Sequence, residues 1–251
     1  MNCPKCDFAQ PEGGESCLRC GVIFAKVQAR REAEAGPANS GSRTGASDTD
    51  GTTGWWGGIK ERLFIVPPEP VRFFVVGRAI LYLLMLVWGW RFVTATIAGG
   101  YASETPLHLI NLPFHEAGHV IFGLLGNRFF AVLGGTLGQL VVPAIVIAAF
   151  ILRHDPFGSS VGLWWLGQSC MDVAFYANDA RAGQLPLLGG VTGSEVEDYH
   201  DWEVLLGKLG WLQYDHSIAK LFYGCGTVLM LLALAWGGYL LWRQSRPVTA
   251  G

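Results

Sequence analysis

Long runs of apolar side chains with few charges occupy most of the chain after residue 72. A helix needs about 20 such residues to cross the hydrocarbon core of a bilayer, where its backbone groups must be paired internally. We therefore predict an all-α polytopic membrane protein with about four to five transmembrane helices. The apolar segments cover residues 73–98, 106–125, 129–152, 161–176 and 218–241.

The polar segments divide the chain into three predicted domains. Residues 1–26 form a small cysteine-containing unit, residues 27–58 a linker, and residues 59–246 the membrane domain. The linker is rich in Gly, Ser, Thr, Asp and Ala, a composition that buries too little apolar surface to fold. We expect it to be a flexible tether.

A second polar stretch, residues 178–216, separates the last two apolar segments. From Trp202 onward its leucines recur with helical spacing, at positions 205, 206, 209 and 212. This pattern predicts an amphipathic helix that lies on the membrane or caps the helix bundle.

The composition supports a membrane location and argues against some functions. The chain is 51% hydrophobic and 15% charged, with a formal net charge of −2. Soluble domains are typically about 25% charged. A nearly neutral chain also gives no electrostatic reason to expect nucleic acid as the main partner.

Basic residues around the apolar segments bear on orientation. Lys60, Arg62 and Arg72 precede the first segment and favour a cytoplasmic N-terminus, as expected in a bacterial inner membrane protein. The first residues also lack the pattern of a signal peptide. Five complete spans would place Arg243 and Arg246 on the opposite side, against the same bias. Either one segment is re-entrant, or the first does not span fully.

Four of the six cysteines lie at the N-terminus with the spacing C-x2-C-x10-C-x2-C. Two such pairs can close a tetrahedral zinc site, so Cys3, Cys6, Cys17 and Cys20 predict a zinc ribbon with one structural zinc ion. Disulfides are the alternative, but a cytosolic terminus would keep the thiols reduced. We expect residues 22–24 to form the last strand, and the ribbon to recruit a protein partner.

The segment His115-Glu116-Ala117-Gly118-His119 lies in the second apolar segment. On a helix, histidines four residues apart share a face and can bind one metal ion, with Glu116 placed to take a proton from water. Ionisable groups are costly inside a membrane, so their presence favours a functional site. The structural alternative is a histidine pair that packs or caps a buried helix.

A catalytic zinc site needs a third protein ligand. Asp172 is the leading candidate, because an unpaired carboxylate deep in an apolar segment is costly and a cation offsets that cost. Pairing with Arg78 or Arg91 is the alternative for Asp172. His200 is a rival ligand, or else a cap of the helix that follows it. Asp179 could accept a hydrogen bond from a liganding histidine.

Several other polar residues are weaker candidates. Asp201 and Asp215 are further carboxylates that could bind the metal. His108 shares a helical face with His115, and we expect it to line an aqueous cavity, together with Asn111, Thr136 and Gln139. The glycine-rich stretch 134–138 either lets an extended substrate approach the backbone or permits close helix packing.

With these residues the chain resembles the site-2 protease family of intramembrane zinc metalloproteases, and more closely its bacterial and plant peptidase-like branch. The resemblance covers about residues 70–215. It is carried by the histidine motif in a hydrophobic helix, by an aspartate in a later span, and by the segments 167–172, 179–181 and 185–187.

The resemblance implies that His115 and His119 bind the catalytic zinc ion and that Glu116 is the catalytic base. It also implies an aspartate as third ligand, which we assign to Asp172. The family has Leu-Asp-Gly at this position, whereas this chain has Met171-Asp172-Val173.

The predicted function is that of a zinc metalloendopeptidase that hydrolyses peptide bonds of membrane-protein substrates. The main alternative is a catalytically inactive membrane adaptor or sensor with structural zinc sites. Glu116 favours the enzyme, because a structural zinc site has no use for a base beside its ligand. A metal transporter is less favoured, because the sequence contains no internal repeat that pairs two half-sites.

Overall fold

The computed structural model describes residues 72–245 without a gap, and before them residues 3, 4, 9, 11, 14–17, 22–28 and 62–64. The chain divides into two compact units, Met1–Gly51 and Thr52–Gly251, which are described separately.

In the first unit, two of the four N-terminal cysteines, Cys3 and Cys17, are buried. Ser16 and Ile23 form an isolated antiparallel bridge, and the Cys17 amide donates to the Val22 carbonyl. The pairing falls where the last strand was expected, although the chain becomes helical from Phe24. Cys6, Cys20 and nearly all of the linker lie outside the described residues, so the zinc ribbon and the tether remain predictions.

Residues 72–245 are mostly helical, and the one β pairing among them is an isolated bridge between Pro186 and Thr192. Each of the five predicted apolar segments coincides with a long helix, which confirms the helical fold. The long helices are α3 (Arg72–Thr94), α5 (Pro106–Gly123), α6 (Arg128–Leu152), α7 (Pro156–Asn178) and α9 (Asp215–Ser245). The short ones are η1 (Ile97–Gly99), α4 (Tyr101–Glu104), α8 (Asp201–Leu209) and η2 (Leu212–Tyr214).

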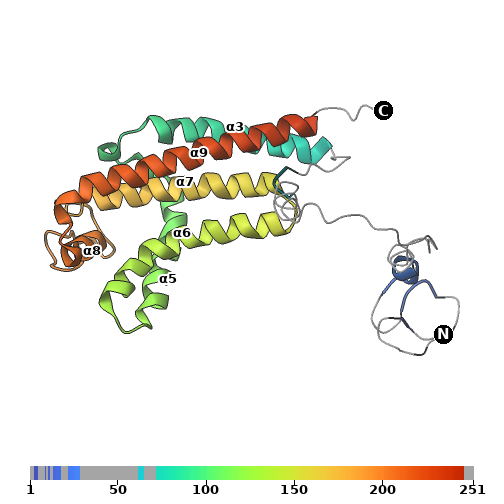
Figure 1. Ribbon diagram of the computed structural model, residues 1–251, viewed down its shortest axis with the longest axis horizontal. Helices are drawn as coiled ribbons and strands as arrows, with labels where there is room; N and C mark the ends of the chain where they lie inside the picture. Colours follow the sequence, from blue (N-terminus) through green and yellow to red (C-terminus); the bar gives the residue numbers. More distant parts are fainter. Residues whose placement is uncertain are drawn as a thin grey trace, which may run out of the picture. The chain divides into compact units, whose positions relative to one another are not determined.

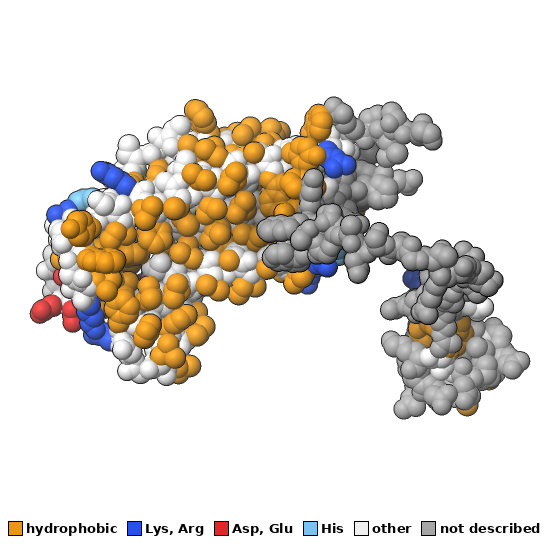
Figure 2. All heavy atoms as spheres, in the orientation of Figure 1, with side chains coloured by type: hydrophobic (Ala, Val, Ile, Leu, Met, Phe, Trp, Pro, Cys, Tyr) orange, Lys and Arg blue, Asp and Glu red, His pale blue; other side chains and the backbone are white. Residues whose placement is uncertain are grey.

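Among the described residues, three helical segments are long and apolar enough to cross a membrane: Phe73–Thr94, Arg128–Leu152 and Leu212–Ser245. Large apolar side chains cover the face shown in Figure 2. Phe73 and Leu124 are 79% and 85% exposed. A soluble surface rarely carries so large an apolar area, so these helices indicate a membrane protein.

Helix α7 lies at the centre of the bundle and packs mainly against α9 and α6 (Figure 1). It is rich in glycine and serine, and most of its residues are buried. A Cβ atom at Gly167 would lie 2.8 Å from the Gly226 carbonyl oxygen of α9. Small residues at this crossing let the two backbones approach, as is common between membrane helices.

Helices α3 and α9 run antiparallel along the bundle (Figure 1). The Tyr82 hydroxyl, near the middle of α3, donates to the Leu234 carbonyl in the second half of α9. The Tyr223 hydroxyl, early in α9, donates to the Ala95 carbonyl just after α3. The start of α3 and the end of α9, with Arg243, therefore lie at the same end of the bundle.

Helix α5 packs mainly against α6 and does not run the length of the bundle (Figure 1). A Cβ atom at Gly118 would collide with the Gly134 carbonyl oxygen, and one at Gly138 with the Phe114 carbonyl oxygen. These glycines let the backbones of α5 and α6 come into contact. Of the two roles considered for residues 134–138, close helix packing is confirmed.

Candidate metal centre

One turn of α5 presents His115, Glu116 and His119 together, as predicted from their spacing. Each offers a ligand atom, and these atoms lie within 4.8 Å of one another. The two imidazole rings have centroids 4.6 Å apart in an edge-to-face arrangement. The three side chains can therefore hold a metal ion.

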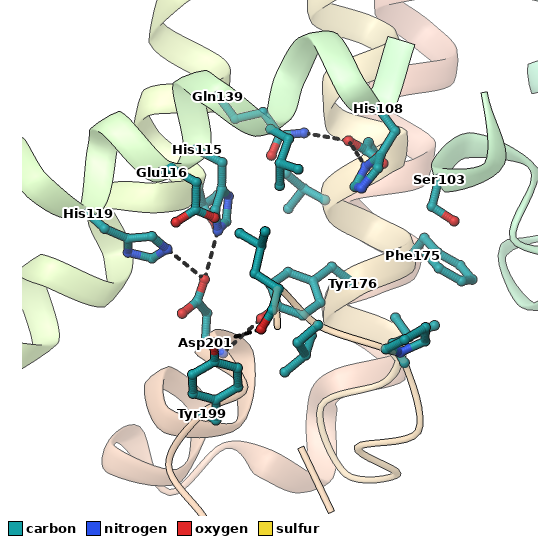
Figure 3. Close-up of a pocket in the computed structure, with 18 of the residues that line it drawn as sticks. Ser103, His108, His115, Glu116, His119, Gln139, Phe175, Tyr176, Tyr199 and Asp201 are labelled. Atoms are coloured by element: carbon teal, nitrogen blue, oxygen red, sulfur yellow. Dashed lines mark hydrogen bonds and ion pairs between the residues drawn. The ribbon is translucent and has the colours of Figure 1, made fainter. Parts of the chain in front are cut away.

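Asp201, the first residue of α8, reaches the same point from outside the long helices. Its Oδ2 lies 2.9 Å from His115 Nε2 and 3.1 Å from His119 Nε2 (Figure 3). Ligand atoms around a tetrahedral zinc ion with bonds of about 2.0 Å are separated by about 3.3 Å. Two imidazole nitrogens and one carboxylate oxygen thus converge with the spacing of a zinc site.

Among the described contacts, the predicted third ligand Asp172 is engaged by other side chains, while Asp201 meets the two imidazoles. Asp172 is buried, but its carboxylate accepts hydrogen bonds from His108 Nδ1 at 2.9 Å, Gln139 Nε2 at 2.8 Å and Asn111 Nδ2 at 3.2 Å. These donors stabilise the carboxylate without a metal ion. Among the described contacts, none joins Asp172 to the two imidazoles of the motif.

The alternative partners considered for Asp172 are also engaged elsewhere. Arg78 forms an ion pair of 3.0 Å with Asp155, the residue that caps the start of α7. The Arg91 guanidinium lies over the ring of Tyr101, 5.0 Å from its centroid. Neither arginine pairs with Asp172.

The orientation of His119 is fixed by a second contact. Its Nδ1 lies 2.9 Å from the carbonyl oxygen of Ala131 on α6, to which the ring N–H can donate. This hydrogen bond leaves Nε2 free to bind a metal, an arrangement typical of liganding histidines.

Gly135 lets both rings lie against the backbone of α6. A Cβ atom at this position would stand 2.5 Å from His119 Nε2 and 2.7 Å from His115 Nε2. Only glycine leaves the space that the two imidazoles occupy.

Asp201 is positioned by the residue before it and by α7. His200 is fully buried and caps α8, with its Nδ1 accepting from the Glu203 amide at 3.3 Å. Its ring stacks on that of Tyr176 with centroids 4.3 Å apart, and the Tyr176 hydroxyl accepts from the Asp201 amide at 3.1 Å. His200 is therefore the helix cap considered above.

Asp179 is not placed to orient a liganding histidine. Its carboxylate accepts from the Leu185 amide at 2.9 Å and lies 3.6 Å from His200 Nε2. It holds the loop that leads to α8.

Burial lowers the pKa of His200, despite the nearby carboxylates of Asp179 and Asp201. Burial would raise the pKa of Asp201, but the hydrogen bonds from His115 and His119 bring it below its usual value.

The site opens into a cavity of about 740 Å³, a volume typical of ligand-binding pockets. His108, Thr136 and Gln139 line it, as predicted, whereas Asn111 lies behind the wall. Glu116 also lines the cavity, and within the described part of the chain its carboxylate has no hydrogen-bond or ion-pair partner. It is therefore available for proton transfer to a bound molecule.

Sequence reasoning counted Asp201 among six candidates but gave it no preference. One signal was present, because Asp201 begins the amphipathic helix that was predicted to cap the bundle. A carboxylate at that position faces the end of the bundle where α5 carries its histidines.

Comparisons with known proteins do not assign a family. No protein-family model, no curated protein and no solved structure matches the chain.

Proposed function

We propose that this protein is an intramembrane zinc metalloprotease, similar to site-2 proteases, that hydrolyses peptide bonds of membrane-protein substrates. The observation that supports it best is the Asp201 carboxylate oxygen, within 2.9 and 3.1 Å of the two motif imidazoles and beside a carboxylate without a partner. A metal site that served only stability would gain nothing from Glu116.

The donor set fits zinc. Two histidines and one carboxylate are the three protein ligands of many catalytic zinc sites, with a fourth position left for water or substrate. His115, His119 and Asp201 would hold the ion. When bound, zinc polarises a carbonyl group and lowers the pKa of a water molecule toward ~7.

The side chains of the cavity supply the remaining chemistry. Glu116 accepts the proton of the attacking water and then delivers it to the amine of the broken C–N bond, so that water is divided between the two products. The cavity holds an unwound stretch of substrate beside the site and limits access of bulk water. Its apolar wall comes largely from α7 and from residues 185–188.

We also propose how the bundle lies in the membrane. Helices α3, α6 and α9, which are long and apolar enough, cross it. Helix α7 crosses with them, because its packing against α6 and α9 buries most of its residues and shields them from lipid. Helix α5 enters and leaves at one end, as a re-entrant segment. An even number of crossings keeps Arg243 on the side where α3 begins, in agreement with the positive-inside bias. This side is the cytoplasm of a bacterial cell, where the N-terminal zinc ribbon recruits a protein partner.

Glu116→Gln is the direct test of the enzyme. The variant and the wild-type protein are expressed with a library of tagged single-span membrane proteins, and cleavage is followed by mass spectrometry of the fragments. We expect Glu116→Gln to keep the zinc of the membrane domain and to lose cleavage by at least ~100-fold, the scale of general acid–base catalysis.

Three outcomes decide the proposal. Loss of cleavage with zinc retained supports it. Equal cleavage by both proteins would show that the fragments come from another protease. If the wild-type protein retains zinc but cleaves no member of the library, the inactive adaptor is the better description.

A further inference from the structure

The cavity has a second polar wall, built around the buried carboxylate of Asp172. Three helices contribute to it: His108 and Asn111 from α5, Gln139 from α6, and Asp172 from α7. The proposed mechanism uses none of these side chains. His108, Gln139 and Asp172 line the cavity, and Asn111 lies behind them in the same hydrogen-bond network. Figure 3 shows His108 and Gln139.

The hydrogen bonds of Asn111 fix the direction of the whole network. Its Oδ1 accepts from Trp165 Nε1 at 2.9 Å and from Ser169 Oγ at 3.3 Å. Its Nδ2 donates to Gln168 Oε1 at 3.0 Å and to Asp172 Oδ2 at 3.2 Å. Both donors and both lone pairs of the amide are used, so Asp172 is the acceptor in this contact.

With Asp172 as the acceptor in all three contacts, His108 Nδ1 carries the hydrogen that it shares with Asp172 Oδ1. The other donors to this carboxylate are neutral amides. Because a buried carboxylate needs a countercharge, His108 completes a neutral ion pair as the imidazolium. Its remaining N–H, on Nε2, is left for a bound molecule, since His108 lines the cavity and 36% of its side chain is exposed.

We infer that His108 Nε2 donates a hydrogen bond to an acceptor oxygen of the substrate polypeptide, with Asp172 as the positioning residue that orients and charges the ring. The inference rests on the proposed protease function and assigns a substrate-binding site within the same cavity. The acceptor is an internal peptide carbonyl or the carboxylate at the end of the chain.

The helix sets how far this contact lies from the reacting bond. Seven residues separate His108 from His115 on α5, which corresponds to a rise of about 10.5 Å. An extended chain advances about 3.3 Å per residue. The acceptor oxygen therefore belongs to a residue about three positions from the scissile bond.

Peptide hydroxamates of graded length test this distance without a known substrate. Each probe has a zinc-binding hydroxamate at one end and one to four alanine or leucine residues, in two series that extend in the two chain directions. Each length is made with an amide end and with a free carboxylate end. Dissociation constants are measured for the full-length protein in detergent, by competition with a fluorescent hydroxamate.

For the wild-type protein we expect affinity to rise by about tenfold or more when the probe in one series reaches three residues, the effect of a hydrogen bond to a charged group. His108→Ala should bind the one-residue probe as the wild-type protein does, and its affinity should not increase when the probe reaches three residues. Asp172→Asn should reduce the rise, because His108 then lacks its countercharge. His216→Ala removes a histidine that does not line the cavity and should retain it.

The two ends of the probes identify the acceptor. A rise with amide-capped probes indicates an internal carbonyl, and a rise confined to free carboxylates indicates recognition of the end of the chain. Either result supports the inference. Zinc content and a cooperative thermal transition establish that each variant is folded.

Failure of the inference can be distinguished from failure of the proposed function. A rise that persists in His108→Ala, or no rise in the wild-type protein while the shortest probe still binds, overturns the role of His108 alone. If the shortest probe does not bind the wild-type protein, or binds equally well to His115→Ala, the metal centre itself is wrong and the inference falls with it.

Discussion

Gly135→Ala is a small substitution that tests the geometry of the metal centre directly. The added Cβ atom would lie 2.5 Å from His119 Nε2 and 2.7 Å from His115 Nε2, whereas ordinary contacts begin at 3.4 Å. To restore a distance of 3.4 Å, the ring of His119 must move away from Gly135 by about 0.9 Å and that of His115 by about 0.7 Å. Helix α6 cannot easily move instead, because Gly134 and Gly138 already bring its backbone against α5.

This displacement is large compared with what a metal site tolerates. Metal–ligand distances hold to within about 0.2 Å. Substitutions that disturb only the partners of ligands reduce metal affinity by about 10–100-fold. Gly135→Ala moves two ligands, so we expect zinc affinity of the membrane domain to fall by at least ~100-fold.

The zinc dissociation constant is measured on the full-length protein by competition with a fluorescent chelator, and stoichiometry by elemental analysis. The double variant His115→Ala/His119→Ala defines the zinc held elsewhere in the chain. Gly207→Ala is the matched control, because a Cβ atom at Gly207 on α8 meets nothing within 4 Å. The geometry described here is refuted if Gly135→Ala remains folded and binds zinc within about twofold of Gly207→Ala.

Two further substitution pairs test the surroundings of the site. Asp201→Asn should lose the zinc ion of the membrane domain, whereas Asp172→Asn should retain it; the opposite result in elemental analysis would restore Asp172 as the third ligand. Arg181→Met should lower the unfolding temperature more than Arg128→Met does, because the buried Asp215 would lose the guanidinium that lies 2.8 Å from its carboxylate. Arg128 is the comparison, because its two contacts with Asp198, a 3.6 Å ion pair and a 2.6 Å hydrogen bond to the carbonyl oxygen, are exposed. Equal losses in thermal unfolding would show that burial of Asp215 does not matter.

The helices could be predicted because hydropathy reports directly on the medium that surrounds them. All five apolar segments coincide with helices to within a few residues at most ends. The largest error is the start of α7, predicted at residue 161 and found at Pro156. Asp155 caps this helix and Pro156 occupies its first turn, a local signal that average hydropathy cannot detect in a glycine- and serine-rich sequence.

The metal site could be predicted only as far as local spacing determines it. The positions of His115, Glu116 and His119 on one turn follow from helix geometry alone. The third ligand depends on tertiary structure. Burial indicated correctly that Asp172 needs compensation, but it could not distinguish a cation from the hydrogen bonds that His108 and Gln139 supply.

The position of Asp201 explains why the third ligand follows a long irregular stretch. A carboxylate within α7 is held by that helix's own packing, whereas Asp201 moves with α8. Helix α8 is fixed by Trp202, whose ring meets that of Phe222 on α9 at 5.4 Å, and by the buried side chain of Leu206. The two imidazoles belong to α5, while the carboxylate depends on contacts with α9 and with Tyr176 of α7. The proposed ligand set is therefore complete only while α8 is docked on the bundle, so we expect any event that loosens α8 to weaken metal binding without altering the His-Glu-His turn.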